Sequence, residues 1–164
     1  MTAGTAGSLA AMGLAIAGQL LLEAALPSRA VPNIYLLTLI YLCHNRHPRW
    51  RTDGAFWSGL VMGAMLSQPP GAYSLAALLA VFLAFSVRGA LARRSSLGML
   101  LEVAVASLVF DLVAVLLLGR PVLVSLPAYL TPLAWRAVLT SAVFLLVSLL
   151  SGFARLLPRA PARR

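Results

Sequence analysis

Long apolar runs with very few charges restrict the fold of this chain more than any other feature. Residues 7–27 are interrupted only by Gln19 and Glu23, and residues 97–118 carry only two charged residues, Glu102 and Asp111. A membrane-spanning helix needs about 20 apolar residues. The chain is 61% hydrophobic and 10% charged, whereas a soluble domain is about 45–50% apolar and about 25% charged. These features exclude a water-soluble globular protein.

We expect an all-α polytopic membrane protein with six transmembrane helices. Six spans use about 120 of the 164 residues, which leaves no room for a separate soluble domain. The second helix rises only about 24 Å, short of a hydrocarbon core of roughly 30 Å, so its neighbours are expected to cover it. A single domain covers residues 1–157 and a basic tail covers 158–164; the expected helices lie at about residues 7–27, 31–47, 54–67, 72–88, 97–118 and 133–157.

Prolines set several of the expected helix boundaries. The third helix is expected to end before Pro69 and Pro70, because proline forces the residue before it out of the helical region. Three prolines then interrupt the apolar stretch 121–132. We expect residues 122–130 to lie at the outer membrane interface, since a loop facing hydrocarbon would leave its backbone groups without hydrogen bonds. The sixth helix is expected to follow this segment.

Arginine supplies all of the basic charge. Thirteen arginines oppose four acids, which gives a formal charge of +9. In a membrane protein this excess orients the chain, because basic loops stay in the cytoplasm, and it does not indicate a nucleic-acid partner. If six helices alternate, Arg29, Arg120 and Arg136 share one side, and both termini are cytoplasmic. The ten arginines expected on the cytoplasmic side are Arg46, Arg49, Arg51, Arg88, Arg93, Arg94, Arg155, Arg159, Arg163 and Arg164.

Two charged residues of opposite sign are expected to pair inside the membrane. Asp111 lies near the middle of the fifth helix, and Arg136 lies near the start of the sixth. An unpaired charge at that depth costs about 2.5–3.5 kcal/mol on insertion scales. Glu23 is the competing partner for Arg136, whereas Glu102 lies about 180° round the helix from Asp111 and cannot form a dyad with it. These intramembrane acids either hold helices together or mark an ion or substrate path.

Residues with catalytic or metal-binding chemistry are few. Cys43, His44 and His47 are metal ligands by type, but the arginines around them repel a cation and no fourth ligand is nearby. Both histidines lie at the opposite membrane face from the outer half of the fifth helix, so Asp111 cannot complete a Ser-His-Asp triad. The motifs Gly-x-Ser-x-Gly and His-Glu-x-x-His are absent. We therefore expect no enzyme activity, no metal and no cofactor.

Small residues recur every four positions on two of the expected helices. The first helix carries Gly7, Ala11 and Ala15, and the third carries Gly59 and Gly63. Such a stripe lets two helix backbones approach closely in lipid. It either packs this bundle or receives the helix of a partner. Ala11, Ala15, Gly59 and Gly63 are the candidate partner-binding residues.

The order of several short motifs is similar to one bacterial membrane-protein family. Pro32-Asn33 leads into a short helix with Tyr41, and Gly59-Leu-Val-Met-Gly63-Ala-Met-Leu66 follows. Pro69-Pro70-Gly71-Ala-Tyr-Ser74-Leu75 and Ser107-Leu-Val-Phe-Asp111 complete the pattern. In length, helix count and motif order, nearly the whole chain resembles the rod shape-determining protein MreD. Family members often carry an acid after the third helix, where this chain has Ser67-Gln68, so the role of that acid is not carried over.

The resemblance implies a non-enzymatic scaffold of the cell-elongation (rod) complex in the bacterial inner membrane. Its implied partner is MreC, with the elongation transpeptidase, RodA and MreB as indirect partners, in support of peptidoglycan synthesis and cell shape. The family also resembles the substrate-binding subunits of energy-coupling-factor transporters in fold. The alternative function is therefore a vitamin-binding subunit of such a transporter, which requires several convergent polar or aromatic groups in a pocket.

Overall fold

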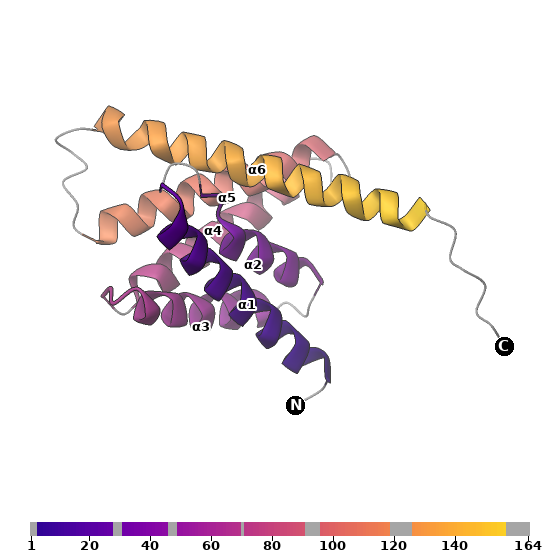
Figure 1. The fold of residues 1–164 in the computed structure, drawn as a ribbon, viewed down its shortest axis with the longest axis horizontal. Helices are drawn as coiled ribbons and strands as arrows, with labels where there is room; N and C mark the ends of the chain where they lie inside the picture. Colours follow the sequence, from indigo (N-terminus) through magenta and orange to yellow (C-terminus); the bar gives the residue numbers. More distant parts are fainter. Residues whose placement is uncertain are drawn as a thin grey trace.

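The computed structural model is a bundle of α-helices. It describes residues 3–27, 31–45, 49–69, 71–90, 96–118 and 126–156, so the expected basic tail at 158–164 lies outside the described residues. Within these ranges, the all-α class and the six helices are confirmed. The helices are α1 (Ala3–Ala25), α2 (Ile34–Asn45), α3 (Arg49–Met65), α4 (Ala72–Ala90), α5 (Ser96–Leu117) and α6 (Leu126–Leu156) (Figure 1).

Three of the described helices are long and apolar enough to cross a membrane. The qualifying segments are Ala6–Ala25 in α1, Gly98–Leu117 in α5 and Tyr129–Leu149 in α6. The apolar segments of α2 and α4, Ile34–His44 and Ala72–Val87, are shorter. Large apolar side chains also cover the outside of the bundle, including Leu14, Leu21, Phe82, Leu146 and Leu149, each more than half exposed. Both features indicate a membrane protein.

Contacts between helix ends define two opposite ends of the bundle. Glu23, late in α1, and Asp111, late in α5, both meet Arg136, early in α6. This is the Arg136 end. His44, late in α2, meets Glu102, early in α5. This is the His44 end, so α1 ends at the Arg136 end and α2 ends at the His44 end.

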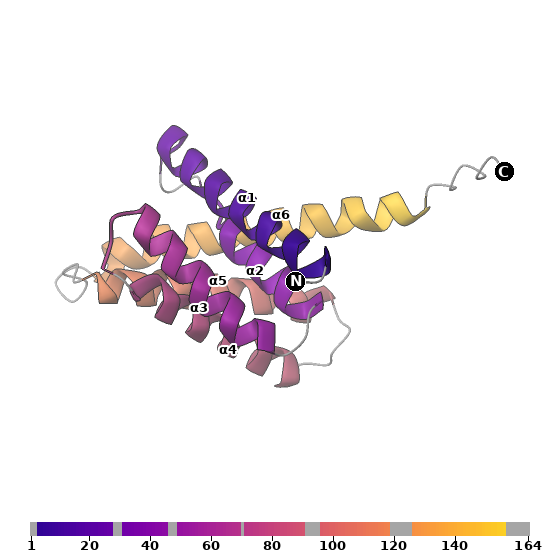
Figure 2. The ribbon, with the colours of Figure 1, turned by 90° about the horizontal axis from the view of Figure 1, so that it is seen from below.

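Further contacts between helix ends show that consecutive helices alternate in direction. Tyr73, early in α4, lies beside Phe110 of α5 at the Arg136 end. Arg51, early in α3, lies over Phe85, late in α4, at the His44 end. Thus α1, α3 and α5 run towards the Arg136 end, and α2, α4 and α6 run back. In both views α1 crosses the bundle obliquely, and α6 extends past the other helices at the His44 end (Figure 1, Figure 2).

The short helix α2 lies at the centre of the bundle. Its 12 residues rise about 18 Å. It contacts each of the other five helices, and Tyr35, Leu36 and Leu39 are fully buried. The expectation of a short second helix covered by its neighbours is confirmed. Because the N-terminal end of α2 is buried, its polar backbone groups need partners from the protein.

Two helices begin earlier than expected. α6 begins at Leu126 and includes Pro132, so the described part of the 122–130 segment is helix and not loop. Proline removes one backbone hydrogen bond, but membrane helices tolerate it where neighbouring groups take up the freed carbonyl. α3 begins at Arg49 and not near residue 54, because polar residues continue the helix beyond the apolar run that set the expectation.

Gly59 and Gly63 belong to the internal contact between α3 and α4. Both are buried, and a Cβ atom added at Gly59 would lie 2.6 Å from Ser74 Cα. The Ser74 hydroxyl donates a hydrogen bond of 2.9 Å to the carbonyl of Phe56. Gly59 and Gly63 therefore face α4 of the same bundle, and their expected role in binding a partner stays a prediction. Four-residue spacing shows that two small residues share a helix face, but it does not show which neighbour that face meets.

We expect Gly59→Ala to destabilise the protein by about 1–3 kcal/mol, because the new methyl group must displace the backbone of Ser74. Gly13→Ala is the matched control, since nothing lies within 4 Å of the corresponding Cβ position. Thermal unfolding in detergent, read as loss of monodisperse protein, measures both changes. Equal stability of the two variants would contradict the close contact between α3 and α4.

Candidate functional site

Arg136 lies between two carboxylates at the Arg136 end of the bundle. Its Nη2 atom lies 2.7 Å from Glu23 Oε1, and its Nη1 atom lies 3.6 Å from Asp111 Oδ1. The side chain of Asp111 is only 4% exposed, that of Arg136 is 20% exposed and that of Glu23 is 28% exposed. The expected pairing partner and its expected competitor are thus both present. Glu23 makes the shorter contact, and Arg136 links α1, α5 and α6.

Hydrogen bonds extend this ion cluster to the N-terminus of α2. Gln19 Nε2 donates to Glu23 Oε1 over 2.8 Å, and Gln19 Oε1 accepts from the backbone N–H of Ile34 over 2.8 Å. The backbone N–H of Asn33 donates to Thr140 Oγ1, and Asn33 Oδ1 accepts from the N–H of Leu36 as a helix cap. These contacts satisfy donors that the buried end of α2 would otherwise leave unpaired.

The sequence pattern did not predict that Gln19, Asn33 and Thr140 join this network. Spacing could have found two of them, because Gln19 lies four residues before Glu23 and Thr140 lies four residues after Arg136, on the same helix faces. Asn33 also stands immediately before a helix start, where asparagine is a preferred cap. What spacing does not show is that three separate helices bring these side chains together.

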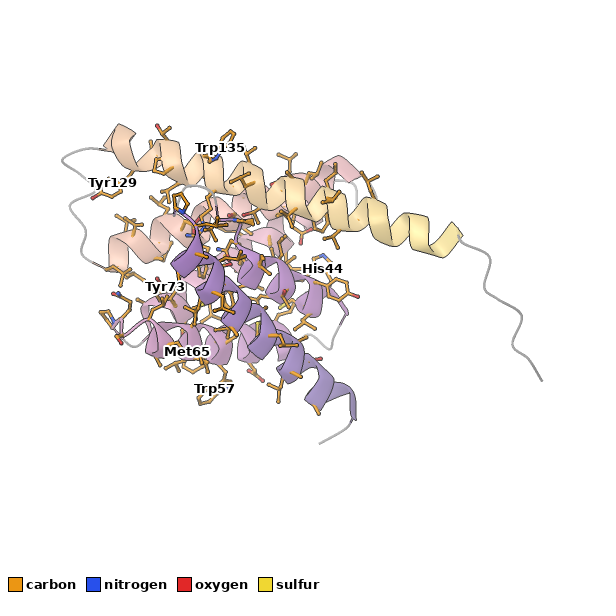
Figure 3. The ribbon with its side chains drawn as sticks, in the orientation of Figure 1. His44, Trp57, Met65, Tyr73, Tyr129 and Trp135 are labelled. Carbon is orange, nitrogen blue, oxygen red and sulfur yellow. The ribbon has the colours of Figure 1, made fainter. Side chains whose placement is uncertain are left out.

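A cavity of about 300 Å³ lies beside the ion cluster. Tyr73 and Phe110 form an aromatic part of its wall, with ring centroids 6.0 Å apart. Among the described residues, Asp111 Oδ2 and Arg136 Nε have no hydrogen-bond partner. Figure 3 shows Tyr73 at the opposite end of the bundle from His44. The remaining lining residues are Glu23, Met62, Ala114, Val115, Leu118 and Leu133.

A second polar cluster lies at the His44 end. His44 Nε2 lies 3.2 Å from Glu102 Oε1, and Glu102 is only 2% exposed. The His44 ring stacks on Phe85 with a centroid distance of 4.9 Å, and Arg51 lies 3.8 Å above the same Phe85 ring. Glu102 and Asp111 therefore belong to separate clusters, as their spacing predicted. His44 was not expected as the partner of Glu102.

Cys43 and His44 belong to no larger group of metal-ligand side chains in the described part of the chain. No group of three or more His, Cys, Asp and Glu side chains gathers there in a metal-binding arrangement. Cys43 is buried and His44 contacts Glu102. His47 lies outside the described residues.

An apolar groove of about 420 Å³ lies between α1 and α3. α1 packs mainly against α2, and Ala15 is buried and Ala11 half-buried, so neither of these expected partner-binding residues lines the groove. Gly13 is the exposed small residue of α1 that lines the groove instead. Trp57 and Met65 point outward from α3 (Figure 3). The groove is lined by Leu9, Met12, Gly13, Ile16, Asp53, Gly54, Trp57, Ser58 and Val61.

No protein-family model, no curated protein and no solved structure matches the chain. The ion cluster, the cavity and the groove are therefore the features of the molecule that bear on its function.

We expect Arg136 to couple more strongly to Glu23 than to Asp111, because the first contact is 2.7 Å and the second 3.6 Å. Glu23→Gln, Asp111→Asn and Arg136→Gln should each lower thermal stability in detergent. Each double variant, Glu23→Gln with Arg136→Gln and Asp111→Asn with Arg136→Gln, should lose less stability than the sum of its two single variants. The coupling energies should be about 0.5–3 kcal/mol. Glu102→Gln with Arg136→Gln is the control and should be additive, because these residues lie at opposite ends. Additivity of both Arg136 pairs would contradict the bridge.

Proposed function

We propose that the chain is a non-enzymatic scaffold of the cell-elongation complex in the bacterial inner membrane, similar to MreD. In this proposal all six helices cross the membrane, and both termini are cytoplasmic. The alternation of helix directions supports six crossings, because α1, α3 and α5 run towards the Arg136 end and α2, α4 and α6 run back. The His44 end then faces the cytoplasm, where the excess of arginine is expected.

The groove between α1 and α3 is the observation that carries this proposal. A nearly all-membrane protein acts on partners through its faces, and this groove is an apolar recess between two helices. Gly13 and Gly54 on its walls allow close approach of another helix backbone. We assign it to one transmembrane helix of MreC, which would link this chain indirectly to the elongation transpeptidase, RodA and MreB.

Asp53 supports a helix as the occupant. It lies in the groove near the start of α3, at the His44 end. Single transmembrane helices carry lysine or arginine next to their cytoplasmic ends. A partner helix lying in the groove would place such a residue near Asp53. Opposite charges at this position would favour one direction of the partner helix over the other.

Gly13→Leu should reduce copurification of MreC from native membranes several-fold, because the leucine projects into the groove and blocks a helix there. Gly18→Leu is the matched control. Nothing lies within 4 Å of either Cβ position, so both leucines fit the folded protein, and Gly18 lies about 140° round α1 from Gly13. Normal MreC recovery with Gly13→Leu, or equal losses in both variants, would remove the groove as the binding surface.

Substituted cysteines test the proposed topology. Ser67→Cys, in the exposed turn after α3, should react with a membrane-impermeant maleimide on intact spheroplasts. Thr52→Cys, exposed near the start of α3, should react only after permeabilisation. The single native cysteine, Cys43, is buried and should add little background. Labelling of both positions from one side would contradict a crossing by α3, and the reverse pattern would invert the orientation.

The second candidate function is the substrate-binding subunit of an energy-coupling-factor vitamin transporter. The cavity beside Arg136 supports it, because polar and aromatic groups converge there. Copurification separates the two candidates. MreC in the purified complex favours the scaffold, whereas an ATPase module with a bound vitamin favours the transporter.

A further inference from the structure

We propose that the cavity at the Arg136 end binds a small organic ammonium compound, with Asp111 as the carboxylate that receives its positive group. The cavity occupies about 300 Å³, at the lower limit of volumes that hold small molecules. Binding at this cavity does not depend on the occupant of the groove between α1 and α3, so the two proposals can fail separately.

Asp111 places a buried hydrogen-bond acceptor in the wall of the cavity. The side chain is 4% exposed and lines the cavity. Its Oδ1 atom faces Arg136, whereas Oδ2 has no hydrogen-bond partner among the described residues. A buried carboxylate oxygen without a partner is costly, because it has lost its hydration. An N–H group of a ligand would supply the missing hydrogen bond.

The net charge of the ion cluster determines the sign of the charge that a ligand should carry. Two carboxylates, Glu23 and Asp111, share one guanidinium, Arg136. Arg136 makes its shorter contact with Glu23, so Asp111 is the less fully compensated acid. When all three groups are ionised, the cluster carries one net negative charge. One cation in the cavity would balance it.

The cavity walls favour an organic cation over a metal ion. Tyr73 and Phe110 offer aromatic surface, which attracts ammonium groups. Met62, Ala114, Val115, Leu118 and Leu133 offer apolar surface, which suits carbon atoms attached to the ammonium group. The partly exposed side chain of Glu23 marks the side from which a ligand could enter.

Three compounds with the same skeleton test the charge requirement. Phenethylamine is cationic, 2-phenylethanol is neutral and phenylacetate is anionic at neutral pH. We expect calorimetric titration of the full-length protein in phosphatidylglycerol nanodiscs to show phenethylamine binding at least tenfold tighter than either other compound. Equal binding of phenethylamine and 2-phenylethanol, or no binding of phenethylamine, would overturn the proposal.

Asp111→Asn should weaken phenethylamine binding at least tenfold and bring it close to that of 2-phenylethanol. Glu102→Gln is the matched control, because it removes a buried acid from the same helix at the other end of the bundle. Ala114→Leu tests the location independently of charge, since it fills part of the cavity and should also weaken binding. It keeps the proposal testable if Asp111→Asn does not fold. Unchanged affinity in the folded Asp111→Asn or Ala114→Leu protein would overturn the site.

The ammonium group could belong to a soluble amine or to a lipid headgroup. Comparing nanodiscs of equal phosphatidylglycerol content, with either phosphatidylethanolamine or phosphatidylcholine as the second lipid, distinguishes the two sources. Weaker apparent binding of phenethylamine in the phosphatidylethanolamine nanodiscs supports a lipid ammonium group as the occupant. Unchanged binding supports a soluble amine.

Discussion

The contact of Arg136 with Glu23 and Asp111 is the interaction on which the arrangement of the long helices depends. In hydrocarbon there is little hydrophobic driving force between helices, so packing and polar contacts must hold them. Arg136 joins α6 to α1 and α5, the three helices that are long and apolar enough to cross a membrane. Gln19, Asn33 and Thr140 then connect this cluster to the buried end of α2. The central helix and the outer helices are thereby held at one end of the bundle.

This arrangement leaves two separate recesses with different chemistry. The cavity at the Arg136 end contains charged, aromatic and apolar groups, because five helices, α1, α3, α4, α5 and α6, place unlike side chains around one space. The groove between α1 and α3 is almost wholly apolar, with Asp53 near one end. One recess suits a small molecule with a charged group, and the other suits an apolar segment. The proposed scaffold function and the proposed ligand site would therefore use different surfaces of the same bundle.

Much of the fold could be predicted from the sequence, and the errors have identifiable causes. Apolar runs located all six helices, because burial in lipid requires such runs. The start of α6 was misplaced by seven residues, from 133 to 126, because Pro132 was interpreted as a break although the helix continues through it. The spacing of Gly59 shows a stripe but not the neighbour of that stripe, and the backbone of Ser74 lies directly against it.

The sequence by itself determined that the chain is helical and apolar, since these properties depend only on local composition and order. It also identified Asp111, Glu23 and Arg136 as charges that need partners, because isolated charges are costly in a membrane. Only the tertiary structure decided that Arg136 serves both acids, that His44 meets Glu102 and that Gly13 lines an open groove. These contacts join residues far apart in the chain, so they depend on how the helices cross, which local patterns do not specify.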